Sequence, residues 1–221
     1  MFFKTYTKSQ KELKKNIRSI TKDLKVVIGA GGTGFPGWLS TDIPDFDITN
    51  PTHWEYYFKK SSISNILAEH IFEHLNFHEV KIGLTLAKQY LKPGGVCRIA
   101  VPDGNHPSQY VYDLTKPGGI EPGADDHKIF FDVEIVSRLA NSLELDLNLI
   151  EYFDNKGVFH SANHDFEKGY IDRCSKNYKG RFTNSKEELD KFYNSIPSSN
   201  IEQIRQMNIT YTSLFFEYIK K

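Results

Sequence analysis

Histidine and carboxylate side chains that could move a proton lie at three places in the sequence. His70 and His74 are four positions apart, Asp103 follows a short apolar run, and His127 ends the acidic segment Asp125-Asp126-His127. A free hydroxyl is a poor nucleophile near neutral pH, and a side chain positioned to remove its proton accelerates its reaction by about 10²–10⁴-fold. These residues are therefore candidate bases for chemistry at a hydroxyl, and we assign catalytic roles to His74, Asp103 and His127.

Each of these groups also has a structural interpretation. His74 could be a packed, hydrogen-bonded histidine between a helix and a loop, and Asp103 could cap the turn after Pro102. The segment 125–127 could be a solvated turn, a substrate lid that holds a base, or a divalent-ion site. His70 and His74 would share one face of a helix, but no third ligand is placed beside them, so we predict no metal.

A glycine-rich loop points to a second kind of chemistry, the binding of a nucleoside. The stretch KVVIGAGGTGFPGWLSTD, residues 25–42, places Gly29-Ala30-Gly31-Gly32 between an apolar run and a second run that ends in Asp42. Glycine lets the main chain come close to a ligand, and a carboxylate at the tip of the next strand can accept hydrogen bonds from both ribose hydroxyls. The stretch predicts a nucleoside-type cofactor across the carboxyl ends of two neighbouring strands.

The spacing within this stretch bears on which cofactor it is. Gly29, Gly31 and Gly34 fit the dinucleotide pattern G-x-G-x-x-G, which needs a helix that opens at the third glycine and meets a pyrophosphate. Pro36 and Gly37 interrupt at once, and Asp42 follows Gly29 by only 13 positions. S-adenosylmethionine has no pyrophosphate and needs no such helix. We favour it, with an NAD-dependent oxidoreductase as the alternative.

The elements that would position these residues alternate between strand and helix. Such alternation predicts an α/β fold with a doubly wound, mostly parallel, seven-stranded sheet and an antiparallel edge strand. Apolar runs predict strands at 26–28, 38–42, 46–48, 63–68, 96–101, 145–149 and 210–219. Helical spacing and capping residues predict helices at 8–22, 52–59, 76–91, 132–143, 185–194 and 200–207.

The order of these elements brings the candidate residues to one edge of the sheet. In doubly wound folds ligands bind beyond the carboxyl ends of the strands. The glycine loop, Asp42, Asp47, Glu69-His70 and Asp103 all follow predicted strands. We expect one domain over 1–221, with a covering helix in 1–24 and substrate-side loops and insertions at 104–131 and 153–200.

Composition excludes several classes of function. Lysine plus arginine and aspartate plus glutamate both number 28, so there is no basic excess of the kind that nucleic-acid binders show. The two cysteines make no spaced framework and fit a reducing compartment. No apolar run reaches the roughly 18 residues of a membrane span, and the N-terminus lacks the apolar core of a signal peptide. We expect a cytoplasmic protein, with its oligomeric state open.

Several segments, taken in order, resemble a known family. VVIGAGG, PGWLSTDI, AEHIFEHL, YLKPGG and RIAVPD fall within residues 24–103. The chain resembles the S-adenosylmethionine-dependent methyltransferases of the Rossmann-like superfamily. Within that superfamily it is most similar to a branch of small predicted methyltransferases related to methyltransferase type 11. The resemblance continues through His127, 132–143, 169–173 and 211–214.

The resemblance implies roles for individual residues. The loop of Gly29, Ala30, Gly31 and Gly32 would pass under the methionine part of the cofactor. Its other expected contacts are Asp42 on the ribose, Ile43 and Asp47 on the adenine, and Glu69 and His70 beside the amino-acid tail and sulfur. The implied reaction is methyl transfer, which we expect at the hydroxyl of a sugar, a glycan or another small molecule. A non-catalytic module that keeps the fold for binding is a further alternative.

Overall fold

The computed structural model describes residues 6–20, 22–175, 185–198, 201–207 and 211–221. The α-helices are α1 (Lys8–Ser19), α2 (Pro51–Tyr57), α3 (Phe77–Tyr90), α4 (Gln109–Thr115), α5 (Val133–Ser142), α6 (Lys186–Asn194) and α7 (Ile201–Met207). The strands are β1 (Leu24–Ile28), β2 (Leu39–Thr41), β3 (Ile63–Glu69), β4 (Leu91–Val101), β5 (Leu145–Phe153), β6 (Phe159–Ser161) and β7 (Leu214–Lys220). Short 3₁₀ turns form at η1 (Phe72–His74), η2 (Ala124–Asp126) and η3 (Phe166–Lys168).

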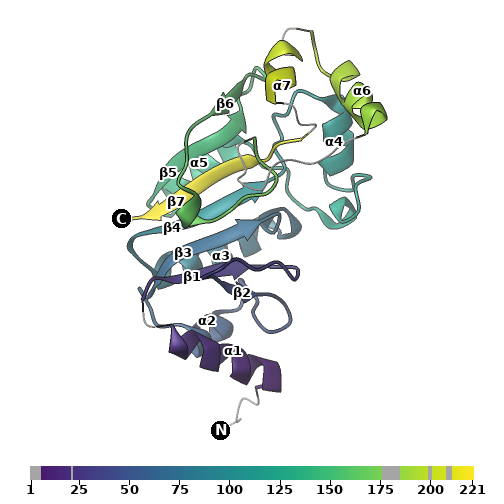
Figure 1. Cartoon of the computed structure of the whole chain (residues 1–221). Helices are drawn as coiled ribbons and strands as arrows, with labels where there is room; N and C mark the ends of the chain where they lie inside the picture. The colour runs from purple at the N-terminus through teal and green to yellow at the C-terminus, as the bar shows by residue number, and fades with distance from the viewer. Residues whose placement is uncertain (1–5, 21, 176–184, 199–200, 208–210) are drawn as a thin grey trace.

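The strands form one seven-stranded sheet in the order β2-β1-β3-β4-β7-β5-β6 (Figure 1). Strands β1 to β4 pair in parallel. Strand β7 lies antiparallel between β4 and β5, and β6 is an antiparallel edge strand beside β5. The predicted α/β class, the number of seven strands in the sheet and the antiparallel edge strand are confirmed. Parallel β1 to β4 bring the residues that follow them to the same edge of the sheet.

The prediction of a strand at 46–48 is wrong. The segment is irregular, and its polar groups bond locally: Phe46 N–H donates to Asp42 O, and Trp54 Nε1–H donates to Ile48 O. Phe46 and Ile48 are buried in the core, where Phe46 packs edge-on against Trp54. A three-residue apolar run marks burial, and burial alone does not distinguish a strand from a buried turn.

Two further differences lie in the segments predicted to be substrate-side loops and insertions. The segment 104–131 contains helix α4, and 153–200 contains strand β6, which pairs with the last residues of β5. The predicted strand at 145–149 extends to Phe153, and β6 takes the edge position beyond it. Residue 200, where the predicted helix 200–207 begins, and residue 210, where the predicted strand 210–219 begins, lie outside the described residues.

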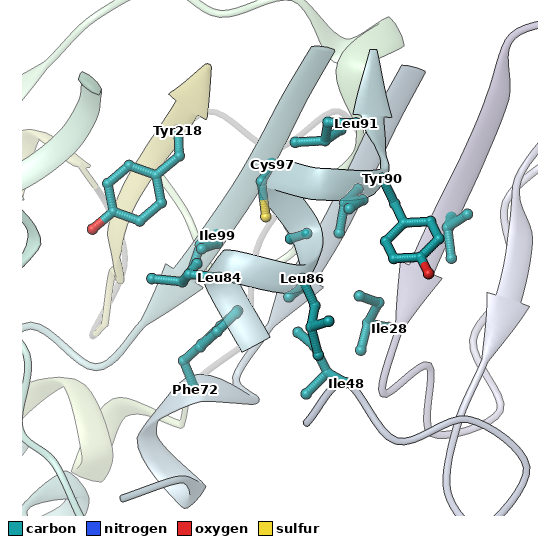
Figure 2. Close-up of a cluster of buried hydrophobic side chains, with 14 of the residues drawn as sticks. Ile28, Ile48, Phe72, Leu84, Leu86, Tyr90, Leu91, Cys97, Ile99 and Tyr218 are labelled. Atoms are coloured by element: carbon teal, nitrogen blue, oxygen red, sulfur yellow. The ribbon is translucent and has the colours of Figure 1, made fainter. Parts of the chain in front are cut away.

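One face of the sheet packs against helices α1, α2, α3 and α5, which share a single hydrophobic core with it. Alternate strand residues point to this face. Figure 2 shows Cys97 and Ile99 of β4, Tyr218 of β7 and Leu84 of α3, which belong to this shared core. The hydroxyl of Tyr218 donates to the carbonyl of Val136 at 2.8 Å, which ties α5 to the central strands. The core therefore fixes β3 and β4, whose carboxyl ends carry the candidate bases.

The opposite face is covered by the segment that runs from η3 to Ser175. Its residues Ile171 and Cys174 pack on Leu67 and Phe215 of the sheet. The buried Arg98 of β4 anchors this segment, because its guanidinium donates to the carbonyls of Asp165 and Gly169. The segment then ends above the carboxyl edge of β3.

Among the described residues, no helix combines the length and the hydropathy that crossing a bilayer requires.

Figure 1 shows α1 and α2 at one end of the sheet, beside β1 and β2, and α4, α6 and α7 gathered at its far side. Helix α4 contacts α6 there, over a small core that includes Val111, Phe153 and Phe192.

Candidate functional site

The loop after β1 is built by glycines in left-handed conformations. Gly29, Gly31 and Gly32 have φ angles of +63°, +54° and +86°, which other residues adopt at a cost. A Cβ atom on Gly29 would overlap the side chain of Ile71, whereas one on Gly31 or Gly32 would meet no protein atom within 4 Å. No helix forms between β1 and β2, a connection whose residues are all described. The main chain at Gly31 and Gly32 is thus open to close approach by a ligand.

Asp42 follows β2 and holds this loop in place. Its Oδ2 accepts a hydrogen bond from the N–H of Gly31 at 2.8 Å, and its Oδ1 accepts one from the N–H of Ile43 at 2.8 Å. A carboxylate has about four acceptor positions, so two remain for the hydroxyls of a ligand. Ile43 beside it is 72% exposed, which leaves an apolar surface next to the carboxylate.

A first cavity, of about 320 Å³, opens beside the glycine loop. Gly29, Ala30 and Phe35 line it from one side, and Glu69 of β3 lines it from another. Asp172 and Arg173 also line it, since Glu69 Oε1 accepts hydrogen bonds from their backbone N–H groups at 3.1 and 2.8 Å. This volume falls at the lower end of the range for small-molecule sites, about 300–1,000 Å³.

His70 stands at the end of β3 in a strained conformation. Its φ angle is +55°, in the left-handed region that non-glycine residues seldom adopt. The ring is held on both sides: Nε2 lies 3.0 Å from Ser213 Oγ, and Nδ1 lies 2.8 Å from Glu73 Oε1. A strained conformation of this kind persists where surrounding contacts hold it. Here the contacts with Ser213 and Glu73 orient the His70 ring between the first cavity and a second one.

A second cavity, of about 170 Å³, lies on the other side of His70. It is lined by His70, Glu73, His74, Pro102, Glu121, Pro122, Gly123, Ala124, His127 and Arg173. The rings of His74 and His127 meet edge-on, with centroids 4.7 Å apart. Because His70 and Arg173 line both cavities, these two residues form the boundary between them.

His74 and His127 are each oriented by a hydrogen bond at Nδ1. His74 Nδ1 lies 2.5 Å from Asp126 Oδ1, and His127 Nδ1 lies 2.8 Å from the carbonyl oxygen of Thr115. A carbonyl can only accept, so Nδ1 of His127 carries a proton, and in the neutral form of the ring the lone pair is on Nε2. The same holds for His74 while Asp126 is ionised.

Two buried groups complete the polar surroundings. Glu73 is fully buried, and among the described residues neither of its carboxylate oxygens makes an aligned hydrogen bond, despite the short contact with His70. Burial raises the pKa of Tyr211 well above its ordinary value, and the charge of Glu73 adds to this effect. Tyr211 therefore stays protonated beside His70, at a ring-centroid distance of 6.0 Å.

Half of the twelve site residues predicted from the sequence line these two cavities. Gly29, Ala30, Glu69 and His70 line the first cavity, and His74 and His127 line the second. The predicted contacts Gly31, Gly32, Asp42 and Ile43 continue the same glycine loop and its partner strand.

Two predicted residues lie elsewhere. Asp103 is buried and accepts hydrogen bonds from the N–H groups of Asn105 and Phe153 at 2.9 and 2.7 Å. Burial raises its pKa to about 7. Asp47 accepts from the N–H and hydroxyl of Thr49. Neither side chain lines the first or the second cavity. Asp47 bonds within its own turn, whereas Asp103 bonds both to its turn and to β5.

Sequence reasoning gave no role to Glu73, Asp172, Arg173 or Ser213. Glu73 lies inside the AEHIFEHL segment, whose repeated acid–histidine pair was the available signal. Asp172 and Arg173 reach the site because Glu69, more than 100 positions earlier, binds their backbone. No local pattern encodes such a contact.

A larger cavity, of about 520 Å³, lies at the other end of the strands, between α1 and α2. Lys14, Arg18, Tyr56 and Lys92 are among the residues that line it. In open α/β sheets ligands bind beyond the carboxyl ends of the strands. The first and second cavities lie at the carboxyl ends of the strands, and we place the candidate site at them.

No protein-family model matches the chain, and no curated protein sequence matches it. Solved structures similar to it include a SAM-dependent methyltransferase from Archaeoglobus fulgidus, at 13% identity and a TM-score of 0.47 over 96% of this chain and 93% of that one. A SAM-dependent methyltransferase from Thermotoga maritima has 14% identity and a TM-score of 0.44 over 67% and 77%. Haemonchus contortus phosphoethanolamine N-methyltransferase 2, in complex with S-adenosyl-L-methionine, has 11% identity and a TM-score of 0.43 over 96% and 52%. At these identities and TM-scores the similarity is one of backbone arrangement only. The residues of the two cavities therefore carry the functional argument.

Proposed function

We propose that the chain is an S-adenosylmethionine-dependent methyltransferase that acts on the hydroxyl of a sugar or another small molecule. One observation carries the proposal: two cavities share His70 and Arg173 as their common wall. The first cavity adjoins the glycine loop, and the second holds the paired histidines. A methyl donor in the first cavity and an acceptor in the second would meet at that wall.

The first cavity suits a nucleoside with a charged amino-acid tail. The main chain at Gly31 and Gly32, next to Ala30 of this cavity, is open to close approach by a ligand. Asp42 has acceptor positions left for ribose hydroxyls, and Ile43 supplies an apolar surface for the base. Glu69 and Arg173 bring one negative and one positive side chain to this cavity. Glu69 would hold the ammonium group of the tail, and Arg173 would hold its carboxylate.

The same loop disfavours a dinucleotide. A pyrophosphate is ordinarily held at the N-terminus of a helix that opens at the last glycine of the motif. The connection from Gly29 to Trp38 contains no helix. The NAD-dependent alternative therefore loses the element that would bind its phosphates.

The second cavity would hold the acceptor. Its volume of about 170 Å³ fits a single ring or a short polar group better than a macromolecular segment. The histidines, Glu121 and Arg173 give it donors and acceptors that suit hydroxyls. This polarity supports a sugar or a polyol over an apolar acceptor.

The chain's own residues would align and activate the acceptor. Bound S-adenosylmethionine supplies a methyl group already activated on a sulfonium. The acceptor oxygen would form the new bond to the methyl carbon as the carbon–sulfur bond breaks with its electron pair left on sulfur, and His74 and His127 would receive the hydroxyl proton. Alignment across the His70–Arg173 wall would contribute several kcal/mol, and proton removal roughly 10²–10⁴-fold.

Methyl-tritiated S-adenosylmethionine tests the proposal directly. Incubation of the protein with this donor and a panel of sugars and small alcohols should give a labelled methyl ether. His127→Ala should lower the turnover by about 10²-fold while the affinity for the donor stays within a few-fold. His78→Ala, at an exposed position on α3, is the matched control and should retain full turnover. Full activity of both His74→Ala and His127→Ala would overturn the assignment of the acceptor side.

A further inference from the structure

Three side chains around the second cavity bring metal-ligand atoms together. Glu73 and His74 lie on η1, and His127 follows η2. One carboxylate oxygen and one nitrogen from each ring lie within 4.8 Å of one another. Ligand atoms about 2.0–2.2 Å from one ion lie roughly 3–3.5 Å apart, so small side-chain rotations would complete a site.

The two histidines present the arrangement that metal-binding histidines show in proteins. Such a histidine donates its non-ligating N–H to a carboxylate or a backbone carbonyl, which fixes the tautomer and the ring. Here Asp126 and the carbonyl of Thr115 take those hydrogen bonds at Nδ1. The nitrogen left with a lone pair is Nε2 in both rings.

Glu73 gives an independent reason to expect a cation. A carboxylate without aligned hydrogen bonds is costly to bury, and such groups are found paired or bound to a metal. Glu73 is fully buried, and its contact of 2.8 Å from Oε1 to Nδ1 of His70 lacks hydrogen-bond alignment. A cation between Glu73 and the two imidazoles would give this carboxylate an aligned partner.

We propose that Glu73, His74 and His127 bind one divalent first-row transition metal, with zinc as the favoured ion. Two imidazoles and one carboxylate suit zinc and its neighbours, whereas magnesium and calcium prefer oxygen ligands alone. Three protein ligands leave at least one coordination position open, as catalytic zinc sites do. All three ligand residues line the second cavity, so that position faces the space where the acceptor would lie.

The metal would determine how the acceptor hydroxyl loses its proton, and this consequence rests on the proposed methyl transfer. A hydroxyl bound to the ion would lose its proton near neutral pH, because a cation lowers the pKa of a coordinated oxygen. With the ion bound, His74 and His127 would act as its ligands in place of accepting the proton themselves, and the hydroxyl proton would leave to solvent. Acceptors with two neighbouring hydroxyls, which can chelate the metal, are the substrate class that this site favours.

Direct metal binding, without donor or acceptor, tests the site apart from the proposed reaction. Metal-stripped full-length protein should bind one Zn²⁺ by isothermal titration, and one Co²⁺ with visible absorption bands that report nitrogen ligands. His127→Gln and Glu73→Gln should weaken binding by at least about 10-fold, and His78→Gln should not. If Glu73→Gln fails to fold, His127→Gln alone decides.

Unchanged affinity in His127→Gln, or no saturable binding of either ion to the wild-type chain, would overturn the metal site. Metal binding in a protein that does not bind S-adenosylmethionine would keep the metal site and refute the methyltransferase. The two claims therefore fail separately.

Discussion

The carboxylate of Asp42 accepts a hydrogen bond of 2.8 Å from the backbone N–H of Gly31. This contact joins the tip of β2 to the glycine loop after β1, 11 residues earlier. It places an acid beside the stretch of main chain that is open to a ligand. In our account Asp42 therefore both shapes the loop and binds the ribose.

Replacing Asp42 should weaken cofactor binding more than it weakens the fold. Asp42→Asn keeps an acceptor for Gly31 but loses the charge and one acceptor oxygen, so we expect at least a 10-fold loss in S-adenosylmethionine affinity, about 1.4 kcal/mol. Isothermal titration measures it. Asp23→Asn removes an exposed acid at the opposite end of β1 and should leave the affinity unchanged. Equal effects of the two variants would refute the role of Asp42.

Two glycines of the loop should respond differently to alanine. Gly29→Ala would strain the backbone and overlap Ile71, so we expect a loss in unfolding free energy of about 2–4 kcal/mol. Gly31→Ala meets no protein atom within 4 Å, so its cost to stability should be only about 1 kcal/mol from the backbone. Its methyl group would instead occupy ligand space and lower the S-adenosylmethionine affinity.

Urea unfolding and titration of both glycine variants separate these effects. A Gly31→Ala protein with wild-type affinity would show that the cofactor does not approach this part of the loop.

The loop and strands at the carboxyl edge of β1 and β2 could be predicted because their signals are local. The run 26–28, the glycines and Asp42 mark β1, the loop and the end of β2 within a few positions of one another. Asn76 and Glu79 form the predicted capping box at the start of α3. Side chains at helical or alternating spacing then define the buried faces.

The rest depends on contacts between distant residues. The strand at 46–48 was predicted from apolar residues that are buried in a turn. The hydrogen bond that Asp103 accepts from the N–H of Phe153, 50 positions later, had no signal in the sequence. Asp172 and Arg173 reach the first cavity through Glu69 and the Arg98 anchor. Such placements follow from the assembled sheet, and no short-range pattern carries them.

The buried ion pair between Arg98 and Glu217 should be essential to the fold. Arg98 Nε and Nη2 donate to Glu217 Oε1 at 3.1 and 2.6 Å, with both side chains out of solvent. Arg98→Met would leave Glu217 charged and unpaired, so we expect a loss in unfolding free energy of about 3–5 kcal/mol. Arg138→Met removes an arginine from an exposed ion pair with Glu134 and should cost at most about 1 kcal/mol.

Urea denaturation of the Arg98 and Arg138 variants provides the comparison. The double variant Arg98→Met/Glu217→Met should lose less than the sum of the two single variants, because it leaves no buried charge unpaired. Strict additivity would contradict this coupling.

Asp103 should make the fold less stable as the pH rises. Burial raises the pKa of Asp103 to about 7 in the folded chain, against an ordinary value of 3.8. Between these values the native state holds a proton that the unfolded state has released, so the contribution of Asp103 to the unfolding free energy falls with rising pH. The decrease approaches about 4 kcal/mol for a shift of roughly 3 pH units.

Asp103→Asn, which does not titrate, should remove this slope. The difference in unfolding free energy between the wild type and this variant, followed from about pH 4 to pH 8, isolates the contribution of Asp103 from that of other groups. A difference that stays constant across this range would show that Asp103 keeps an ordinary pKa in the fold.

The measurement that tests the central claim most directly is the equilibrium titration of the folded, wild-type chain with S-adenosylmethionine and, separately, with NAD⁺. We predict one binding site for S-adenosylmethionine with a Kd below about 100 µM, and no saturable binding of NAD⁺. Absence of S-adenosylmethionine binding at about 1 mM, or tighter binding of NAD⁺, would contradict the account.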